Sequence, residues 1–184
     1  MPVSEETFQQ LALEDPNQWE LHCGSLRRKP TMTAEHNDLA RLLHIQLVQQ
    51  LDVGLFRVSL NIGHVRRSAE HYYIPDVFVI PIELLRAQFG TRRLEAYVEP
   101  LPLVVEVWSP STGEYDVESK LPEYQRRGDA EIWRLHPYER TLTAWRRQAD
   151  GSYTETVVHG GTVKPVALPN VTIDLDPLFQ TLPD

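Results

Sequence analysis

The sequence predicts a mixed α/β fold in which a central mixed β-sheet is flanked by helices. Two short apolar runs at 73–80 and 103–108 are rich in β-branched and aromatic residues, as buried central strands are. Upstream of both, leucines recur at every fourth position from Leu39 to Leu51, which indicates an amphipathic helix. Strands and helices therefore alternate along the chain, and this order favours a sheet with helices on its faces.

Length and composition bound the class of protein. The 184 residues suffice for one domain with a real core and are too few for two, so we expect a single domain over 1–184. No stretch reaches the ~18 consecutive apolar residues of a membrane helix, and the acidic first residues lack the apolar core of a signal peptide. A single cysteine, Cys23, cannot form an internal disulfide. We therefore expect a cytoplasmic protein that does not enter a membrane.

The net charge of −8 argues against a protein that coats nucleic acid without specificity. The basic residues are nevertheless clustered, in short runs at 27–29, 66–67, 92–93, 126–127 and 146–147. Such patches are compatible with phosphate contacts, although solvated surface charge is the simpler interpretation.

The first part of the chain carries clear start and stop signals. In order, we expect a helix over 5–14, a hairpin over 19–27, a helix from 33 to about 51, a strand over 55–65 and a polar loop over 63–70. Asp15-Pro16-Asn17 ends the first helix, and alternation around Gly24 indicates the hairpin. Thr33 is placed to cap the long helix.

The second part adds further strands and two short helices. In order, we expect a helix over 81–89, an exposed connection over 90–100, a strand ending near 108, a turn over 109–113, and strands over 131–135 and 141–145. Between the turn and these last strands, a short helix carries Lys120 and Tyr124 and ends at Gly128. It should begin near Ser119 or Lys120, because Pro122 fits only a first helical turn. The tail forms an extra β-hairpin around Asp150-Gly151 and a proline-punctuated end.

Each central apolar run carries one carboxylate, Asp76 in the first and Glu106 in the second. A lone buried ion is costly, and neighbouring strands lie only ~4.8 Å apart, so one divalent ion between them would explain both acids. Oxygen ligands suit Mg²⁺ or Mn²⁺. Lys120 would then orient the attacking water or stabilise charge in the transition state. The structural alternative is that Asp76 caps a strand entry and that Glu106 pairs with an arginine.

The order of these residues resembles a known family. The matching positions are Pro75-Asp76, Glu106-Val107, 109–112, Asp116, Lys120, Tyr124, Gly128 and 131–133. Together they resemble the Uma family of putative restriction endonucleases, within the PD-(D/E)XK nuclease superfamily, over roughly 19–145. The resemblance implies a restriction-endonuclease-like core with Asp76 and Glu106 as catalytic metal ligands. The superfamily lysine normally lies two residues after the second acid, where this chain has Trp108, and Lys120 is expected to replace it.

The resemblance also suggests supporting residues, each of which has a simpler interpretation. Glu20 is a further acid near the metal or an exposed strand residue, and His36 belongs to the site or caps its helix. Ser109 and Thr112 are placed to bind phosphate, with a plain turn as the alternative for Thr112, and Tyr124 positions Lys120 or only packs. Asp116 is expected to cap or precede the Lys120 helix, and Trp133 and Trp145 are expected in the core.

These observations predict a Mg²⁺-dependent endonuclease that hydrolyses DNA by metal-activated water, working as a homodimer so that two sites meet the duplex. One alternative is a non-catalytic DNA-binding or assembly module that keeps the nuclease fold, and another is a hydrolase of a different phosphodiester. The sequence contains no phosphate-binding glycine loop, so no nucleotide cofactor is expected. The histidines show no zinc-type spacing, and a lone cysteine predicts no thiolate site.

Overall fold

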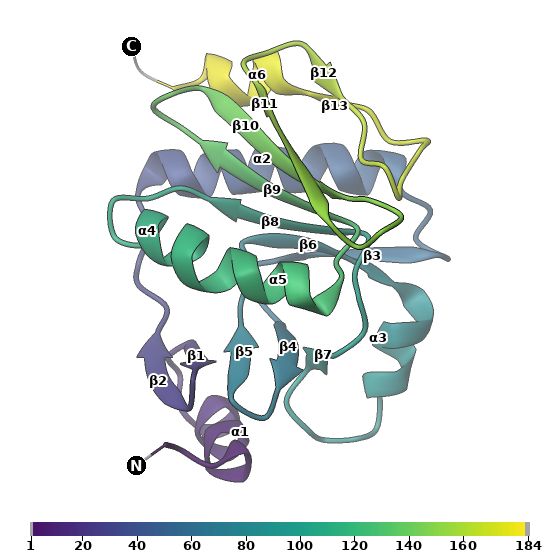
Figure 1. The fold of residues 1–184 in the computed structure, drawn as a ribbon. Helices are drawn as coiled ribbons and strands as arrows, with labels where there is room; N and C mark the ends of the chain where they lie inside the picture. Colours follow the sequence, from purple (N-terminus) through teal and green to yellow (C-terminus); the bar gives the residue numbers. More distant parts are fainter. Residues whose placement is uncertain (1, 183–184) are drawn as a thin grey trace.

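The computed structural model describes residues 2–182 (Figure 1). In chain order its elements are α1 (Glu5–Glu14), β1 (Trp19–His22), β2 (Ser25–Arg28), α2 (Ala34–Gln50), β3 (Phe56–Leu60), β4 (His64–Ser68), β5 (His71–Tyr73), β6 (Val77–Pro81), α3 (Ile82–Gln88), β7 (Ala96–Tyr97), β8 (Leu103–Val107), α4 (Gly113–Tyr115), the π-helical turn η1 (Asp116–Lys120), α5 (Leu121–Arg127), β9 (Glu131–His136), β10 (Thr141–Arg147), β11 (Tyr153–Val158), β12 (Thr162–Val163), β13 (Ile173–Asp174) and α6 (Leu175–Gln180).

The predicted mixed sheet with helices on its faces is confirmed. Its six strands lie in the order β11-β10-β9-β8-β6-β3, and β8 and β9 run parallel whereas the other neighbours are antiparallel. Figure 1 shows α2 behind this sheet and α4 and α5 in front of it. A second, five-stranded sheet, β2-β1-β5-β4-β7, lies beside it together with α1, and the sequence did not predict it.

Alternation along the central strands sends side chains to opposite faces of the sheet. Val79 and Val105 are buried among the leucines of α2, whereas Phe78 and Val104 are buried in the cluster that contains Tyr124 of α5. Both faces are apolar and covered, which explains why the two central strands are near-continuous hydrophobic runs. The sheet is thereby a rigid platform for polar groups at the strand ends.

Several predicted elements are confirmed with their end signals. The helix over 5–14 and the hairpin around Gly24 are present, and α2 ends at Gln50. Thr33 Oγ1 accepts a hydrogen bond from the His36 N–H at 3.3 Å, as an N-cap does. Gly128 ends α5 with a φ of +84°, a left-handed conformation that glycine adopts without strain. The β10–β11 hairpin surrounds Asp150-Gly151.

The predicted strand over 55–65 is confirmed only over its first half, and the predicted loop over 63–70 is wrong, because His64–Ser68 form β4. β3 ends at Leu60, and the backbone then turns through positive φ angles at Asn61 (55°) and Gly63 (76°). The next strand, β4, belongs to the other sheet, so the alternating pattern spans two strands. Ile62, read as part of the strand, is 60% exposed in the turn between them.

The predicted Asp76 strand is also interrupted. β5 ends at Tyr73 and β6 begins at Val77, so Asp76 occupies the short connection that contains Pro75. Proline cannot donate to a strand ladder, which accounts for the break. Asp76 therefore lies at the point where the chain passes from one sheet to the other.

Two segments that were expected to be irregular contain structure. The connection over 90–100 includes β7, whose Tyr97 is buried with its ring 6.0 Å from that of Phe78. The tail includes α6, which buries Leu175 and Leu178 in the same core as the leucines of α2. Both segments are too short for a periodic signal, so tertiary packing decides their structure.

The helix that carries Lys120 begins earlier than predicted, at Gly113 of α4, and passes through η1 before α5. The Leu121 N–H donates to the Asp116 carbonyl, five residues back, so the backbone is widened just before Pro122. A proline ring clashes with the preceding turn of a regular helix, and the π-helical turn accommodates it without a new helix start.

Among residues 2–182, no helix combines the length and apolar character needed to cross a membrane.

Candidate active site

Asp76 is held by three donors from three different segments. Its Oδ1 lies 2.9 Å from Lys29 Nζ, and its Oδ2 lies 2.9 Å from His36 Nε2 and 2.8 Å from the Val107 amide nitrogen. The side chain is 1% exposed. Burial acts to raise its pKa, but the Lys29 charge and the His36 hydrogen bond together hold the pKa of Asp76 well below its usual range. Asp76 is therefore an ionised, fixed carboxylate.

Glu106 lies close to Asp76. The β6–β8 register pairs Val77 with Val105, and the Val107 N–H donates to Asp76 Oδ2, so Asp76 and Glu106 lie at the same end of these two neighbouring strands. Glu106 Oε1 accepts from Lys120 Nζ at 3.2 Å and from the Tyr124 hydroxyl at 2.5 Å. Burial raises the pKa of Glu106 well above its usual range despite the Lys120 charge.

Lys120 lies among three carboxylates. Its Nζ is 2.9 Å from Glu20 Oε1, 3.2 Å from Glu106 Oε1 and 3.4 Å from Asp116 Oδ1, and its side chain is 3% exposed. Burial acts to lower its pKa, but these acids, Glu106 above all, raise the pKa of Lys120 well above its usual range. The lysine that the sequence placed on the following helix thus reaches Glu106 as a fixed cation.

The supporting residues divide into two groups. Glu20, His36 and Tyr124 contact the Asp76–Glu106–Lys120 set, and Glu20 Oε1 also accepts from the Ile74 N–H at 2.9 Å. Glu20 is 2% exposed, so its interpretation as an exposed strand residue is wrong. Ser109 instead contacts the Ser111 and Thr112 hydroxyls, at 3.1 and 2.9 Å.

The tryptophan prediction is confirmed, and the one for Asp116 is corrected. Trp133 and Trp145 are 0% and 8% exposed and belong to the two core clusters. Asp116 does not precede its helix: it begins η1, inside a continuous helical segment, and its carboxylate lies one turn before Lys120.

Lys29 is a site residue that the sequence did not reveal. It was grouped with Arg27 and Arg28 as a basic run, yet its side chain is 5% exposed and also donates to the Ile74 carbonyl at 2.9 Å. An alternating pattern of apolar and polar residues does not predict that Lys29 is buried, because β2 is exposed throughout and Lys29 follows its last residue. Only the fold places Lys29 beside Asp76.

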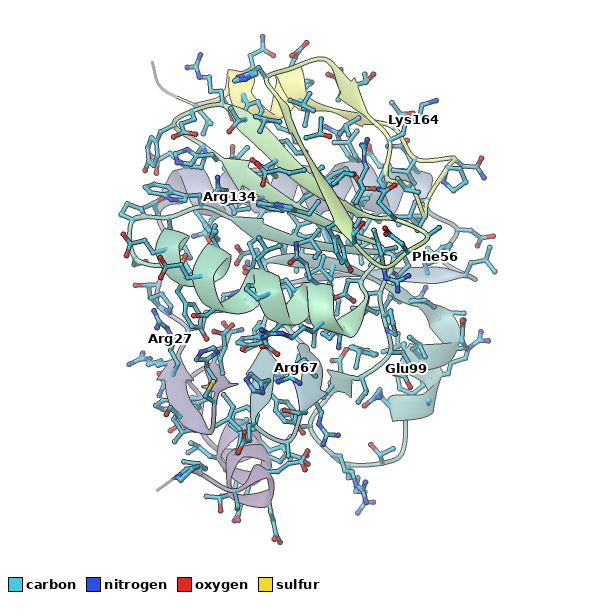
Figure 2. All side chains as sticks on the ribbon, viewed as in Figure 1. Arg27, Phe56, Arg67, Glu99, Arg134 and Lys164 are labelled. Atoms are coloured by element: carbon cyan, nitrogen blue, oxygen red, sulfur yellow. The ribbon has the colours of Figure 1, made fainter. Side chains whose placement is uncertain are left out.

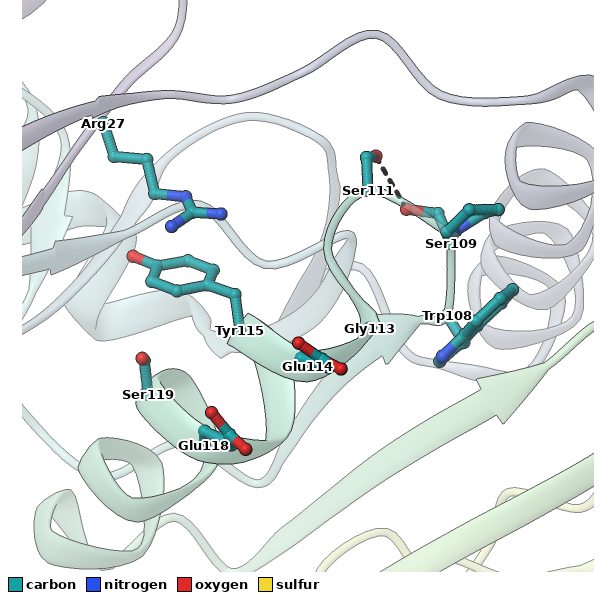
Figure 3. A pocket seen from close by; sticks show the side chains of 10 residues that line it. Arg27, Trp108, Ser109, Ser111, Gly113, Glu114, Tyr115, Glu118 and Ser119 are labelled. Carbon is teal, nitrogen blue, oxygen red and sulfur yellow. Dashed lines mark hydrogen bonds between the residues drawn. The ribbon is translucent and has the colours of Figure 1, made fainter.

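A hollow of about 500 Å³ lies between the hairpin and the α4–η1 segment, lined among others by Arg27, Ser109, Tyr115, Glu114 and Glu118. Figure 3 shows Arg27 reaching from the hairpin over the Tyr115 ring, whose centroid lies 3.7 Å from the guanidinium carbon. With all side chains drawn, Arg27 lies on the side where the hairpin approaches α4 (Figure 2). Tyr115 and Ser119 are the chain neighbours of Asp116 and Lys120, but none of the buried carboxylates lines the hollow itself.

The donor set fits a hard divalent cation. Four buried carboxylates face two ammonium groups, which leaves two negative charges uncompensated when all are ionised: the acids are Glu20, Asp76, Glu106 and Asp116, and the lysines are Lys29 and Lys120. Asp116 Oδ1 is buried without a hydrogen bond, although Lys120 lies at ion-pair distance. Oxygen-only ligands suit Mg²⁺ or Mn²⁺, and either ion supplies the two missing charges.

The two central acids should affect stability with opposite dependence on pH. The lowered pKa of Asp76 gives stabilisation that is present above its ordinary value of 3.8 and is lost below it. The raised pKa of Glu106 gives stabilisation that is present below 4.5 and is lost as pH rises through the folded-state pKa. In urea unfolding with chelator present, the free energy of unfolding of Glu106→Gln should rise relative to that of wild type between about pH 5 and 8. Over the same range, the free energy of unfolding that Asp76→Asn loses relative to wild type should stay constant.

The exposed Glu118 provides the control, because Glu118→Gln should follow wild type at every pH. Parallel pH trends for the Asp76 and Glu106 variants would contradict the opposite shifts.

Comparison with known proteins bears on the family and the fold of the chain. A model of the Uma2 family, described as "Putative restriction endonuclease", matches residues 5–176. Among solved structures, "a putative nuclease belonging to DUF820" from Anabaena variabilis has a TM-score of 0.77 at 17% identity, covering 97% of this chain and 98% of that chain. At this identity the likeness shows a shared fold, and it confirms the predicted fold class. No curated protein matches the chain.

Proposed function

We propose that this chain, which belongs to the Uma2 family of putative restriction endonucleases, is a Mg²⁺-dependent endonuclease that hydrolyses DNA phosphodiester bonds. The observation that carries the proposal is the Lys120 ammonium, held 2.9 to 3.4 Å from three buried carboxylates of the cluster that includes Asp76. Neither a structural core nor a simple binding surface requires four acids and two lysines at one buried point.

Asp76 and Glu106 would hold the cation, with Glu20 and Asp116 beside them. When bound, Mg²⁺ or Mn²⁺ supplies Lewis-acid polarisation of a phosphoryl oxygen and lowers the pKa of a bound water. The chain keeps the ligands in place: Lys29, His36 and the Val107 N–H fix Asp76, and Tyr124 fixes Glu106 Oε1. These contacts fix the ligand side chains before any cation binds.

Lys120 would act on the reacting phosphate itself. Its charge is maintained by the surrounding acids, so it can stabilise the negative charge that develops on phosphoryl oxygens or orient the attacking water. Arg27 lines the neighbouring hollow and is exposed, so it can contact an adjacent phosphate. Glu114 and Glu118 line the same hollow, so Arg27 provides a single positive charge there beside two carboxylates.

One observation favours the second candidate, a non-catalytic module that retains the fold. Glu20, Asp76, Glu106 and Lys120 are each at most 4% exposed, so a phosphodiester must displace side chains to reach them. Metal-dependent turnover on any nucleic acid would exclude this candidate. A panel of duplex DNA, single-stranded DNA and RNA would separate the DNA endonuclease from a hydrolase of another phosphodiester.

The proposal is tested by nicking and linearisation of supercoiled plasmid by the chelator-treated protein. Cleavage should appear on addition of Mg²⁺ or Mn²⁺, disappear with excess EDTA, and be lost in Glu106→Gln but not in the control Glu83→Gln, at an exposed position of α3 outside the hollow. Equal cleavage by Glu106→Gln would contradict the site. The homodimer and the cytoplasmic location stay predictions, and sedimentation tests the dimer.

A further inference from the structure

A second set of metal-ligating side chains meets at the tip of the β1–β2 hairpin. It consists of His22, Cys23 and His71, whose donor atoms all lie within 4.8 Å of one another. His22 ends β1, Cys23 begins the hairpin turn, and His71 starts β5, 48 residues later in the chain. None of the three contacts Asp76, Glu106 or Lys120 through a hydrogen bond or ion pair within the described part of the chain. The carboxylate site and this set are therefore separate donor groups.

The distances match a tetrahedral metal site. Cys23 Sγ lies 3.6 Å from His22 Nε2 and 3.5 Å from His71 Nε2. In a tetrahedral zinc site, bonds of about 2.0–2.1 Å to nitrogen and 2.3 Å to sulfur place these two ligand atoms about 3.5 Å apart. The rings of His22 and His71 are perpendicular, with centroids 5.7 Å apart, so both nitrogens approach the thiol without stacking.

The far nitrogen of each ring is held by a hydroxyl. His22 Nδ1 lies 2.7 Å from the Tyr73 hydroxyl, and His71 Nδ1 lies 2.9 Å from Ser68 Oγ. Arg67 Nη2, which can only donate, also lies 3.3 Å from His71 Nδ1, so this longer contact has to give way when Nδ1 carries a proton that it donates to Ser68 Oγ. With protons on both Nδ1 atoms, both Nε2 lone pairs point toward the thiol, as in zinc sites whose histidines are oriented by outer partners.

Local backbone geometry fixes the thiol at this point. His22 pairs with Ser25, so Cys23 and Gly24 form a two-residue turn, with φ angles of 49° and 73°. Cys23 is exposed, which leaves a ligand position open to water. The hairpin itself is joined to β5 through a single register pair, Leu21 with Tyr72. A metal held by His22, Cys23 and His71 would add a further link between β1 and β5, beside the His22–Tyr73 hydrogen bond.

We propose that His22, Cys23 and His71 bind a Zn²⁺ ion, with water in the fourth position. On binding, the Cys23 thiol gives its proton to solvent and its sulfur forms the bond to zinc, while the two imidazoles bind as neutral ligands. The ion would clamp β1 onto β5. Because Glu20 lies on β1, two residues before His22, the clamp would also steady one acid of the carboxylate cluster.

Titration of the chelator-treated protein with Co²⁺ tests the proposal, because a thiolate ligand gives Co²⁺ an intense near-ultraviolet charge-transfer band that carboxylates do not give. Wild type should show the band together with the visible spectrum of tetrahedral Co²⁺, and Zn²⁺ should abolish both. Cys23→Ser should show neither, and Glu106→Gln should match wild type. Tyr73→Phe should weaken Zn²⁺ binding about 10–100-fold, because it removes the partner of His22.

Thermal unfolding supplies an independent readout. Stoichiometric Zn²⁺ should raise the midpoint of wild type and of Glu106→Gln but not that of Cys23→Ser, a change at an exposed turn that leaves the fold intact. The absence of a thiolate band in wild type would overturn the proposal. A band that persists in both His22→Gln and His71→Gln would overturn it as well, since the thiol would then bind metal without the histidines.

Discussion

Replacing Lys120 by methionine is expected to lower the rate of DNA cleavage about 10²- to 10³-fold, the usual cost of removing one preorganised electrostatic group from a transition state. The expectation rests on the position of its Nζ, within 2.9 to 3.4 Å of Glu20, Glu106 and Asp116. No other lysine or arginine contacts Glu106 through an ion pair in the part of the chain that the structure describes. Single-turnover cleavage of a labelled duplex measures the effect without interference from product release.

Two further variants separate a catalytic role from a structural one. Lys120→Arg keeps the charge but not the compact ammonium, so it should preserve stability better than Lys120→Met and still lose most of the rate. Lys164→Met, at an exposed lysine in the tail, should leave cleavage and stability unchanged. A Lys120→Met protein that remains folded and cleaves at the wild-type rate would show that Lys120 has no part in the reaction.

Replacing Lys29 by methionine is expected to lower the free energy of unfolding by about 3–5 kcal/mol, because it leaves the Asp76 carboxylate buried without its principal cation. The ion pair is 2.9 Å long, and both side chains are at most 5% exposed, so water cannot take the place of the ammonium. Urea unfolding of the chelator-treated protein measures the loss.

A double-mutant cycle identifies the cause of that loss. If the cost comes from an unpaired Asp76, the combined Lys29→Met and Asp76→Asn protein should be more stable than the sum of the single changes predicts, by up to about 3 kcal/mol. Arg28→Met, at the exposed neighbouring position, should stay within about 0.5 kcal/mol of wild type. Additive effects would mean that Lys29 stabilises the fold through its Ile74 and Asn61 contacts instead.

The sequence predicted the central part of the fold because its signals are local. The apolar run over 103–108, the leucine stripe of α2 and the Thr33 cap each contain their own evidence, and the structure confirms these elements. The errors occur where one periodic pattern spans two elements, as around Asn61, or where packing decides the structure of a short segment, as in β7 and α6. A pattern of alternation does not reveal that the chain changes sheets.

In the candidate site, too, the residues with a local sequence signal could be predicted and those placed only by the fold could not. Asp76 and Glu106 stand out because a charge inside an apolar run is unusual, and both are buried at the same end of two neighbouring strands. Lys29 and Asp116 carry no such signal, since one follows an exposed strand and the other looked like a helix cap. His71 joins His22 and Cys23 only through the β1–β5 pairing, so spacing along the chain could not have revealed that cluster.

Thermal unfolding with and without Mn²⁺ tests the central claim, that the buried carboxylates form a divalent-cation site, without any assumption about the substrate. A ligand that binds only the folded state stabilises it by about 2.7 kcal/mol at a hundred times its Kd. We predict that Mn²⁺ raises the midpoint of wild type and of Glu118→Gln but not that of Glu106→Gln. A midpoint that rises equally in Glu106→Gln, or that does not rise in wild type, would contradict the claim.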